Sequence, residues 1–447
     1  MKFSANKNYD SWGRNPRCKS KKIQQLSWFH SLLTPDMSED DVTCLVYGQG
    51  RSYGDSCLNE DGIIIDGSQL NHIHFFDKKN GIIRCEAGTT FDDILSVIVP
   101  HGWFLPVTPG TRFITVGGAT ANDVHGKNHH QVGSFGNHIT ALELRRSDNE
   151  ILICSNNNNS NHFKATIGGL GLTGLITWVE FNLKKIITPY ISTTQKSFKS
   201  IEGFFDLDQA TTSEYTVAWI DTSSRAEKLG RGIYYTGEHA VEHPVAYTRK
   251  KPSRSPLNIP IDFPSIALNA FTIKTFNNLY FYLHQKKPEQ SLSHYAPFFY
   301  PLDNILNWNR MYGKRGFFQY QCVVPIIDGK DVITEILKLV SQKGMASFLS
   351  VLKKFGNISS VGMMSFPREG YTLALDFPNR GKRTLRFLNE LDKLVSSVGG
   401  VIYPAKDARM SPEMFNQSFP QLNNFREYID PHFSSSFWRR VSNSSTN

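Results

Sequence analysis

Glycine-rich turns recur in the first half of the sequence, at residues 48–55, 109–112, 115–119 and 133–136. Successive backbone N–H groups in such turns form a concave nest that binds an anion without help from a lysine. Glycine also lets the backbone approach another molecule closely. Two turns of this kind can hold the diphosphate of one dinucleotide, so this is the chemistry that we expect here.

A further glycine motif imitates a Rossmann fingerprint. Residues 169–174 read G-L-G-L-T-G and satisfy the G-x-G-x-x-G pattern. That fingerprint follows a strand, opens a helix and has an acidic residue about 20 positions later. Here residues 176–183 have the composition of a strand, and Lys184 and Lys185 are basic. We therefore interpret the motif as a turn and not as a nicotinamide dinucleotide site.

Three histidines cluster at His125, His129 and His130. Imidazole is a common metal ligand, but no carboxylate accompanies the cluster and Gly126 favours a loop over a helix that would align the rings. Metal binding is the weaker interpretation, and we expect no metal site.

Length and composition restrict the class of protein. A chain of 447 residues exceeds one ordinary domain, and 40% hydrophobic residues suffice for packed cores. The formal net charge of +9 favours an anionic substrate, cofactor or surface. The basic residues are scattered, apart from residues 249–251 with Arg254, and no nucleic-acid-binding motif accompanies them. We expect no nucleic acid partner.

Cysteines and apolar runs indicate the compartment. The six cysteines are far apart and form no Cys-x-x-Cys pair, which favours a reducing environment. No run approaches the roughly 18 apolar residues of a membrane-spanning helix, and residues 1–10 lack the apolar core of a signal peptide. We expect a cytoplasmic or peripherally membrane-associated protein.

Strand and helix signals place the glycine turns. Strands are predicted at 43–46, 63–66, 72–76 and 82–86, the last two joined by an Asn80-Gly81 hairpin, and later at 151–154 and 175–183. Thr90 is predicted to cap a short helix that Pro100 ends. Residues 106–130 show little periodicity, and we expect a long irregular functional loop there.

The second half of the sequence has a different pattern of predicted strands and helices. Two β-α-β units are predicted: strand 317–324, helix 331–342 and strand 348–352, then strand 371–377, helix 383–398 and strand 401–403. These units suggest an antiparallel sheet backed by helices. Residues 246–300, proline-rich and then aromatic, are expected to form a flap or a surface-seeking segment.

The motifs together resemble the FAD-linked oxidases of the vanillyl-alcohol oxidase superfamily, and within it the decaprenylphosphoryl-β-D-ribose 2′-oxidase family. The resemblance rests on residues 50–55 (G-R-S-Y-G-D), 109–112 (P-G-T-R), 125–130 (H-G-K-N-H-H), 133–137 (G-S-F-G-N), 168–174 (G-G-L-G-L-T-G), 318–321 (F-Q-Y-Q) and 405–409 (A-K-D-A-R). It covers nearly the whole chain.

The resemblance implies an α+β protein: a two-subdomain FAD-binding (PCMH-type) domain with an inserted substrate domain built on an antiparallel sheet covered by helices. We assign residues 1–186 to the FAD-binding domain, 187–400 to the substrate domain, and 401–447 to a segment that returns to the first domain. FAD is expected to be noncovalent. The implied cofactor-binding residues are Gly48, Gly50, Arg51, Ser52, Tyr53, Gly54, Pro109, Gly110, Thr111, Thr115, Gly117, Gly118, Asp123, His125, Gly126, Asn128, His129, Gly171, Gly174 and Ile176.

The resemblance also implies the catalytic and substrate-binding residues. Lys406 matches the family's active-site lysine, and a lysine desolvated beside a flavin can approach neutrality and take a hydroxyl proton. His125 and Tyr53 are assigned supporting roles. The implied substrate-binding residues are Gln319, Gln321, Lys353, Trp219, Phe299 and Thr372. Phe299 stands where the mycobacterial pattern has tyrosine, and Thr372 and Ala374 where some relatives carry asparagine and cysteine, so the substrate differs in detail.

The expected reaction is FAD-dependent oxidation of the 2′-hydroxyl of a polyprenyl-phosphoryl pentose to the 2′-keto sugar. This is the first half of an epimerisation used in cell-envelope polysaccharide synthesis, and a separate keto-sugar reductase would complete it. The alternative is an aldonolactone or alditol oxidase of the same superfamily, with a small free polyol as substrate. A flavin-free binding protein that kept the fold is a third possibility, which a colourless preparation would support. A membrane surface is a further expected partner.

Overall fold

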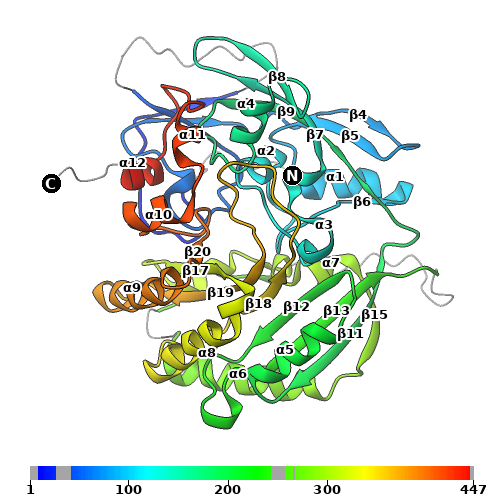
Figure 1. Ribbon diagram of the computed structural model, residues 1–447, viewed down its shortest axis with the longest axis vertical. Helices are drawn as coiled ribbons and strands as arrows, with labels where there is room; N and C mark the ends of the chain where they lie inside the picture. The colour runs from blue at the N-terminus through cyan, green and yellow to red at the C-terminus, as the bar shows by residue number, and fades with distance from the viewer. Residues whose placement is uncertain (1–8, 27–41, 243–256, 265–266, 443–447) are drawn as a thin grey trace.

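The computed structural model describes residues 9–26, 42–242, 257–264 and 267–442, and Figure 1 shows their arrangement. The basic residues 249–251 and Arg254 lie outside this part of the chain. A three-stranded and a five-stranded sheet lie in the N-terminal half, and one eight-stranded sheet makes up most of the remainder. Two further sheets have two strands each: β6 (Trp103–Phe104) with β10 (Lys184–Lys185), and β14 (Leu257–Asn258) with β16 (Ile305–Leu306). The described helices include none that is long and apolar enough to cross a bilayer.

The first small sheet carries the first glycine turn. Its three parallel strands are β1 (Lys22–Gln25), β3 (Ile63–Asp66) and β2 (Cys44–Tyr47), in that order. Ile63, Ile64 and Ile65 are buried, as a continuous β-branched run in a covered parallel strand predicts. The chain leaves the carboxyl end of β2 directly into the turn at Gly48.

The second small sheet is antiparallel and has five strands. Their order is β4 (Ile73–Asp77), β5 (Ile82–Glu86), β9 (Leu175–Asn182), β7 (Ile139–Arg145) and β8 (Ile151–Ser155). Helix α1 (Phe91–Ile98) begins at Thr90, whose side chain accepts from Asp93 N in a capping box, which confirms the predicted cap. The sequence patterns did not predict β7.

Two glycine-rich segments have clear local geometry. Residues 106–130 were expected to be irregular, but they contain α2 (Val116–Ala121), which Thr115 caps by accepting from Gly118 N. This helix is too short, and too rich in glycine and alanine, to show a helical period. The 169–174 motif follows α4 (Ser160–Thr166) and precedes β9, the reverse of the Rossmann order, so the structure confirms that it is a turn.

The large sheet has eight antiparallel strands and joins both predicted β-α-β units. Its order is β15 (Gln290–His294), β11 (Tyr190–Phe198), β13 (Gly232–His239), β12 (Tyr215–Ile220), β18 (Ser350–Phe355), β19 (Gly370–Pro378), β17 (Phe317–Val324) and β20 (Val401–Ile402). Its last strand, Val401–Ile402, belongs to the range that the sequence analysis assigned to the C-terminal segment. Its first four strands were not predicted.

Helices cover one face of this sheet and build the largest core. Three helices contribute to it: α5 (Ile201–Ala210), α8 (Ile326–Gln342) and α9 (Lys382–Ser396). Leu337 and Leu391 pack there against strand residues such as Leu373. Helix α8 begins five residues before the predicted start. The sequence pattern missed these residues because Ile327 is apolar but 91% exposed, which breaks the apolar period. The opposite face of the sheet lines the cavity described below.

Helix α6 (Ala270–Gln285) occupies the middle of the segment that was expected to form a flap. Asn269 caps it with two hydrogen bonds to backbone N–H groups. Ile273 and Phe281 are buried, whereas Phe271 and Leu279 are exposed, so apolar residues lie on both sides and blur the helical period. Residues 270–285 are therefore helical, and the expectation of a flap or a surface-seeking segment stays a prediction.

The C-terminal segment packs against the N-terminal half. Helices α10 (Pro412–Ser418), α11 (Leu422–Arg426) and α12 (Ser436–Ser442), red in Figure 1, lie beside it. Cys44 N donates to His432 O at 2.7 Å, and Ser436 N donates to Leu58 O at 2.8 Å. These bonds join the end of the C-terminal segment to β2 and to the chain that follows the first glycine turn.

Candidate active site

A cavity of about 720 Å³ lies between the glycine turns and the free face of the eight-stranded sheet. Sixteen of the predicted cofactor-binding residues line it: Gly48, Gly50, Arg51, Ser52, Tyr53, Pro109, Gly110, Thr111, Thr115, Gly117, Gly118, His125, Gly126, Gly171, Gly174 and Ile176. Turns that are up to 128 residues apart in the sequence (48 to 176) thus meet at one site.

Four predicted cofactor-binding residues lie behind this lining. A Cβ at Gly54 would stand 1.6 Å from Asp407 O, so glycine is needed there for close packing. Asp123 is buried and accepts from Ser134 Oγ, Gly136 N and Ser365 Oγ. Asn128 Nδ2 donates to Pro106 O, and the His129 ring packs 4.3 Å from that of Phe355. These residues hold the loops in place behind the lining, and their contact with the cofactor stays a prediction.

The turns fit a dinucleotide diphosphate. A Cβ at Gly110 would meet nothing within 4 Å, and one at Gly171 would meet only Leu45 Cδ1 at 3.8 Å, so both glycines face open space in the cavity. The half-buried Arg51 guanidinium lies 4.2 Å from the Trp12 ring centroid, and its Nε has no hydrogen-bond partner among the described residues. Open backbone and a cation with a free N–H donor are what a diphosphate requires.

One face of the eight-stranded sheet forms the floor of the cavity. Gln319 and Gln321 lie on it, since side chains on alternate residues of β17 point the same way. The partners of these glutamines in β19 are Asp376 and Ala374, and Thr372 of β19 is in turn paired with Lys353 of β18. The floor continues through Trp219 of β12, opposite Val351. All six predicted substrate-binding residues therefore line one cavity.

Lys406 enters the cavity from the loop after β20. Its Nζ lies 3.8 Å from the Tyr53 ring centroid, and Tyr53 N donates to Ala405 O at 2.9 Å. Burial lowers the Lys406 pKa to about 7, although Asp376 acts in the opposite direction. Burial also raises the pKa of Tyr53, so its phenol stays protonated. The lysine amine can therefore lose its proton near neutral pH, whereas the phenol cannot.

His125 joins the glycine turns to the sheet. Its Nε2 lies 2.9 Å from Gln321 Nε2, and its Nδ1 lies 3.2 Å from Lys353 Nζ. Burial, and then the charge of Lys353, lower the His125 pKa well below its usual value. The imidazole is therefore neutral and positions Gln321 by hydrogen bonding.

Two functional groups were missed by the sequence analysis. Asp376 is 1% exposed, accepts from Gln319 Nε2 at 2.6 Å and from Tyr312 Oη at 3.3 Å, and has a pKa that burial raises to about 7. The two-residue period from Thr372 through Ala374 leads directly to it and was the available signal. Lys127 lines the cavity, and burial lowers its pKa to about 7.

The cavity has a second arm that leads away from the glycine turns. Trp219 begins it, donating Nε1–H to Phe348 O at 3.0 Å and packing 4.5 Å from the Tyr280 ring. Tyr235 continues the floor, and His284 and Lys287 lie at the α6 end. Phe299 closes the other side and packs 4.8 Å from the Tyr215 ring.

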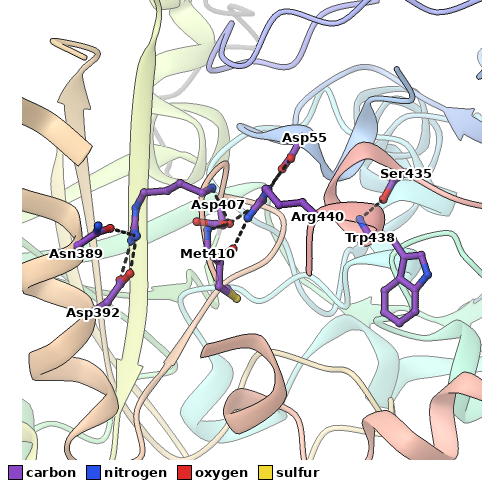
Figure 2. A network of polar contacts seen from close by, with 9 residues as sticks. Asp55, Asn389, Asp392, Asp407, Met410, Ser435, Trp438 and Arg440 are labelled. Atoms are coloured by element: carbon purple, nitrogen blue, oxygen red, sulfur yellow. Dashed lines mark hydrogen bonds and ion pairs between the residues drawn. The ribbon is translucent and has the colours of Figure 1, made fainter. Parts of the chain in front are cut away.

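An ion-pair network holds the Lys406 loop against the first glycine turn (Figure 2). Arg440 makes two hydrogen bonds to Asp55, at 2.9 and 2.7 Å, and one to Asp407 at 3.0 Å. Asp55 ends the glycine turn and Asp407 follows Lys406. One guanidinium of the C-terminal segment thus fixes both sides of the site.

No group of three or more histidine, cysteine or acidic side chains in the described ranges is arranged to hold a metal ion. The histidines instead make separate contacts: His130 Nε2 lies 3.0 Å from Ser213 O, while His125 contacts Gln321 and Lys353.

Comparison with known proteins agrees with this geometry. Residues 35–155 match the FAD binding domain family. The chain is 35% identical to the decaprenylphosphoryl-β-D-ribose oxidase of Mycolicibacterium smegmatis over 408 residues, which is 88% of each chain. It is 30% identical to an uncharacterised protein of Streptomyces coelicolor over 79% of this chain and 99% of that protein. It is also 30% identical to the L-gulonolactone oxidase of Mus musculus, over 30% of each chain.

The family match and the glycine cradle together establish FAD as the cofactor. The first turn offers no histidine for a covalent link, and noncovalent binding agrees with the family. The chain belongs to the decaprenylphosphoryl-β-D-ribose oxidase family of FAD-linked oxidases and is an FAD-dependent oxidoreductase that acts on alcohol groups.

Proposed function

We propose that the protein oxidises the 2′-hydroxyl of a polyprenyl-phosphoryl pentose to the 2′-keto sugar. This is the first half of an epimerisation in cell-envelope polysaccharide synthesis, and a separate reductase then completes it. The observation that carries the proposal is Lys406, a buried amine that shares one cavity with the glycine turns and with Gln319 and Gln321. The similarity to the mycobacterial oxidase over 88% of the chain supports the same reaction class.

The residues of the cavity have separate roles in the proposed reaction. Neutral Lys406 accepts the proton of the sugar hydroxyl, while bound FAD would accept the hydride from the same carbon, so that a C–OH group becomes C=O. Gln319 and Gln321 present amide groups to the other hydroxyls of the sugar. Tyr53 holds the Lys406 ammonium over its ring between turnovers.

The second arm of the cavity provides a route for the lipid. Beyond Trp219 the arm is bordered by Tyr235 and Tyr280 and reaches Lys287, two residues after α6. The outer side of α6 is apolar, with Phe271 77% exposed and Leu279 57% exposed. We propose that the isoprenoid chain leaves along this arm and that α6 rests on a membrane surface, which makes the protein peripherally membrane-associated.

A second candidate is oxidation of a free aldonolactone or alditol. The similarity to L-gulonolactone oxidase favours it, although that match covers 30% of each chain. Phe299, Thr372 and Ala374 differ from the family pattern and change the polarity of the pocket. The experiment below therefore compares lipid-linked and free sugars as substrates.

The test is a spectrum of the purified holoprotein, followed by anaerobic mixing with a panel of sugars. A polyprenyl-phosphoryl pentose should bleach the visible flavin band, whereas a free alditol and an aldonolactone should not. Bleaching by the free polyol or lactone alone would establish the second candidate instead. A colourless protein that takes up no FAD would overturn both.

A further inference from the structure

Lys127 and Lys353 bring two ammonium groups to one corner of the cavity. Lys127 follows the His125-Gly126 turn, and Lys353 lies on the sheet floor in β18. Lys353 Nζ lies 3.3 Å from Gly126 O, so both lysines belong to the same corner. They repel each other, and burial together with this repulsion lowers the pKa of Lys127 to about 7.

In the part of the chain that the structure describes, neither ammonium forms an ion pair with a carboxylate. Lys127 donates to Phe298 O and lies 4.1 Å from the Phe298 ring centroid. Lys353 contacts Gly126 O and His125 Nδ1 and lies 5.7 Å from the Phe355 ring centroid. Carbonyl dipoles, an aromatic face and an imidazole do not balance two ammonium charges, and burial accordingly lowers the pKa of both lysines to about 7. An anion in this corner would stabilise the charged form of both amines.

Lys406 is different, because a carboxylate acts on it. Asp376 raises the Lys406 pKa and the charge of Lys353 lowers it, whereas no acidic group of the described residues acts on Lys353. Lys406, the amine at the reacting hydroxyl, therefore has a carboxylate acting on it. Lys127 and Lys353, next to it, have none among the described residues. Because no carboxylate of the described residues pairs with these two lysines, the anion would come from a ligand of the cavity.

The strand order gives the position of that ligand. Gln321 lies on β17, Lys353 two strands away on β18, and Trp219 one strand further on β12. Neighbouring strands are about 4.8 Å apart, so Lys353 stands roughly 10 Å from the glutamine strand and between it and the lipid arm. In a lipid-linked sugar the phosphate likewise stands between the sugar and the lipid.

We propose that Lys127 and Lys353 form the site for the phosphodiester of the substrate, an inference that rests on the proposed function. The pair selects sugars that carry an anionic group at the anomeric carbon and sets the register of the sugar against Lys406. The diphosphate of FAD is assigned to the glycine turns and does not compete for this corner.

The test compares two synthetic substrates, a farnesyl phosphodiester of the pentofuranose and the matching farnesyl glycoside without phosphate. Replacing one charge-assisted contact in K127M or K353M should lower the preference for the phosphodiester, measured as the ratio of the two kcat/KM values, by about tenfold to a hundredfold. K127R should retain most of the preference. K338M, which removes an exposed lysine of α8, should keep the wild-type ratio.

A binding measurement keeps the inference testable without turnover. Inorganic phosphate should raise the melting temperature of the wild-type holoprotein and of K338M, but not that of the K127M/K353M double variant, at equal FAD content. If neither sugar bleaches the flavin but phosphate still stabilises the wild type selectively, the proposed function fails and the anion site stands. An unchanged substrate ratio in both variants, or equal phosphate stabilisation of all proteins, overturns the site.

Discussion

The Lys406 ammonium lies over the Tyr53 ring, with Nζ 3.8 Å from the ring centroid. Lys406 comes from the C-terminal segment and Tyr53 from the first glycine turn, 353 residues earlier (406 minus 53). The contact therefore sets the position of the proposed proton acceptor relative to the turns that hold FAD. An aromatic face also stabilises the charged form of the amine without forming an ion pair.

The Tyr53 ring and its hydroxyl have separable effects. Y53F retains the face under Lys406 and should reduce the rate of flavin reduction less than tenfold. Y53L removes the face, which is worth about 0.5–2 kcal/mol, and should reduce the rate further. Stopped-flow flavin absorbance at equal FAD content measures both. Equal rates in the two variants would show that the ring contact has no role in catalysis.

Lys406 should give the reaction a pH dependence near neutrality. Because burial lowers its pKa from the usual value of 10.5 to about 7, the amine is protonated below pH 7 and neutral above it. The rate of flavin reduction should therefore rise as the pH increases through about 7 and then level off. Single-turnover rates from pH 5.5 to 9 measure this. A rate that falls over this range would contradict the assignment of Lys406 as the base.

Asp376 should determine where that rise occurs. Its carboxylate raises the Lys406 pKa, so D376N should move the rise to lower pH. The variant preserves the shape of the side chain and its contact with Gln319. N157D, a change of an exposed loop amide, is a control that introduces a carboxylate away from the cavity. An unmoved profile in D376N would show that Asp376 serves packing alone.

Arg440 should be required for stability as well as for site geometry. R440M leaves the carboxylates of Asp55 and Asp407, 5% and 3% exposed, without their cation. Removing one partner of a buried ion pair typically costs about 3–5 kcal/mol. We expect a lower melting temperature and weaker FAD retention than in R426M, which removes an arginine from nearby α11. Wild-type melting and FAD retention in R440M would contradict this role.

The site was more predictable than the domain that forms its floor. Glycine turns and the Thr90 cap are local signals, so they could be predicted from short segments. The first four strands of the large sheet are joined by pairings far apart in the sequence, such as Tyr190 with His294, which no local pattern reveals. Asp376 became visible as a site residue only when β19 was paired with β17, because its partner Gln319 is 57 residues away.

The most direct test of the account is anaerobic reduction of the FAD-loaded protein by a polyprenyl-phosphoryl pentose, with the wild type compared to K406M. General base catalysis typically contributes a factor of about 100 to 10,000, so K406M should bind FAD normally but bleach it at least a hundredfold more slowly. K406M bleaching at the wild-type rate, with the same FAD content, would contradict the central claim that the buried amine takes the proton from the sugar hydroxyl.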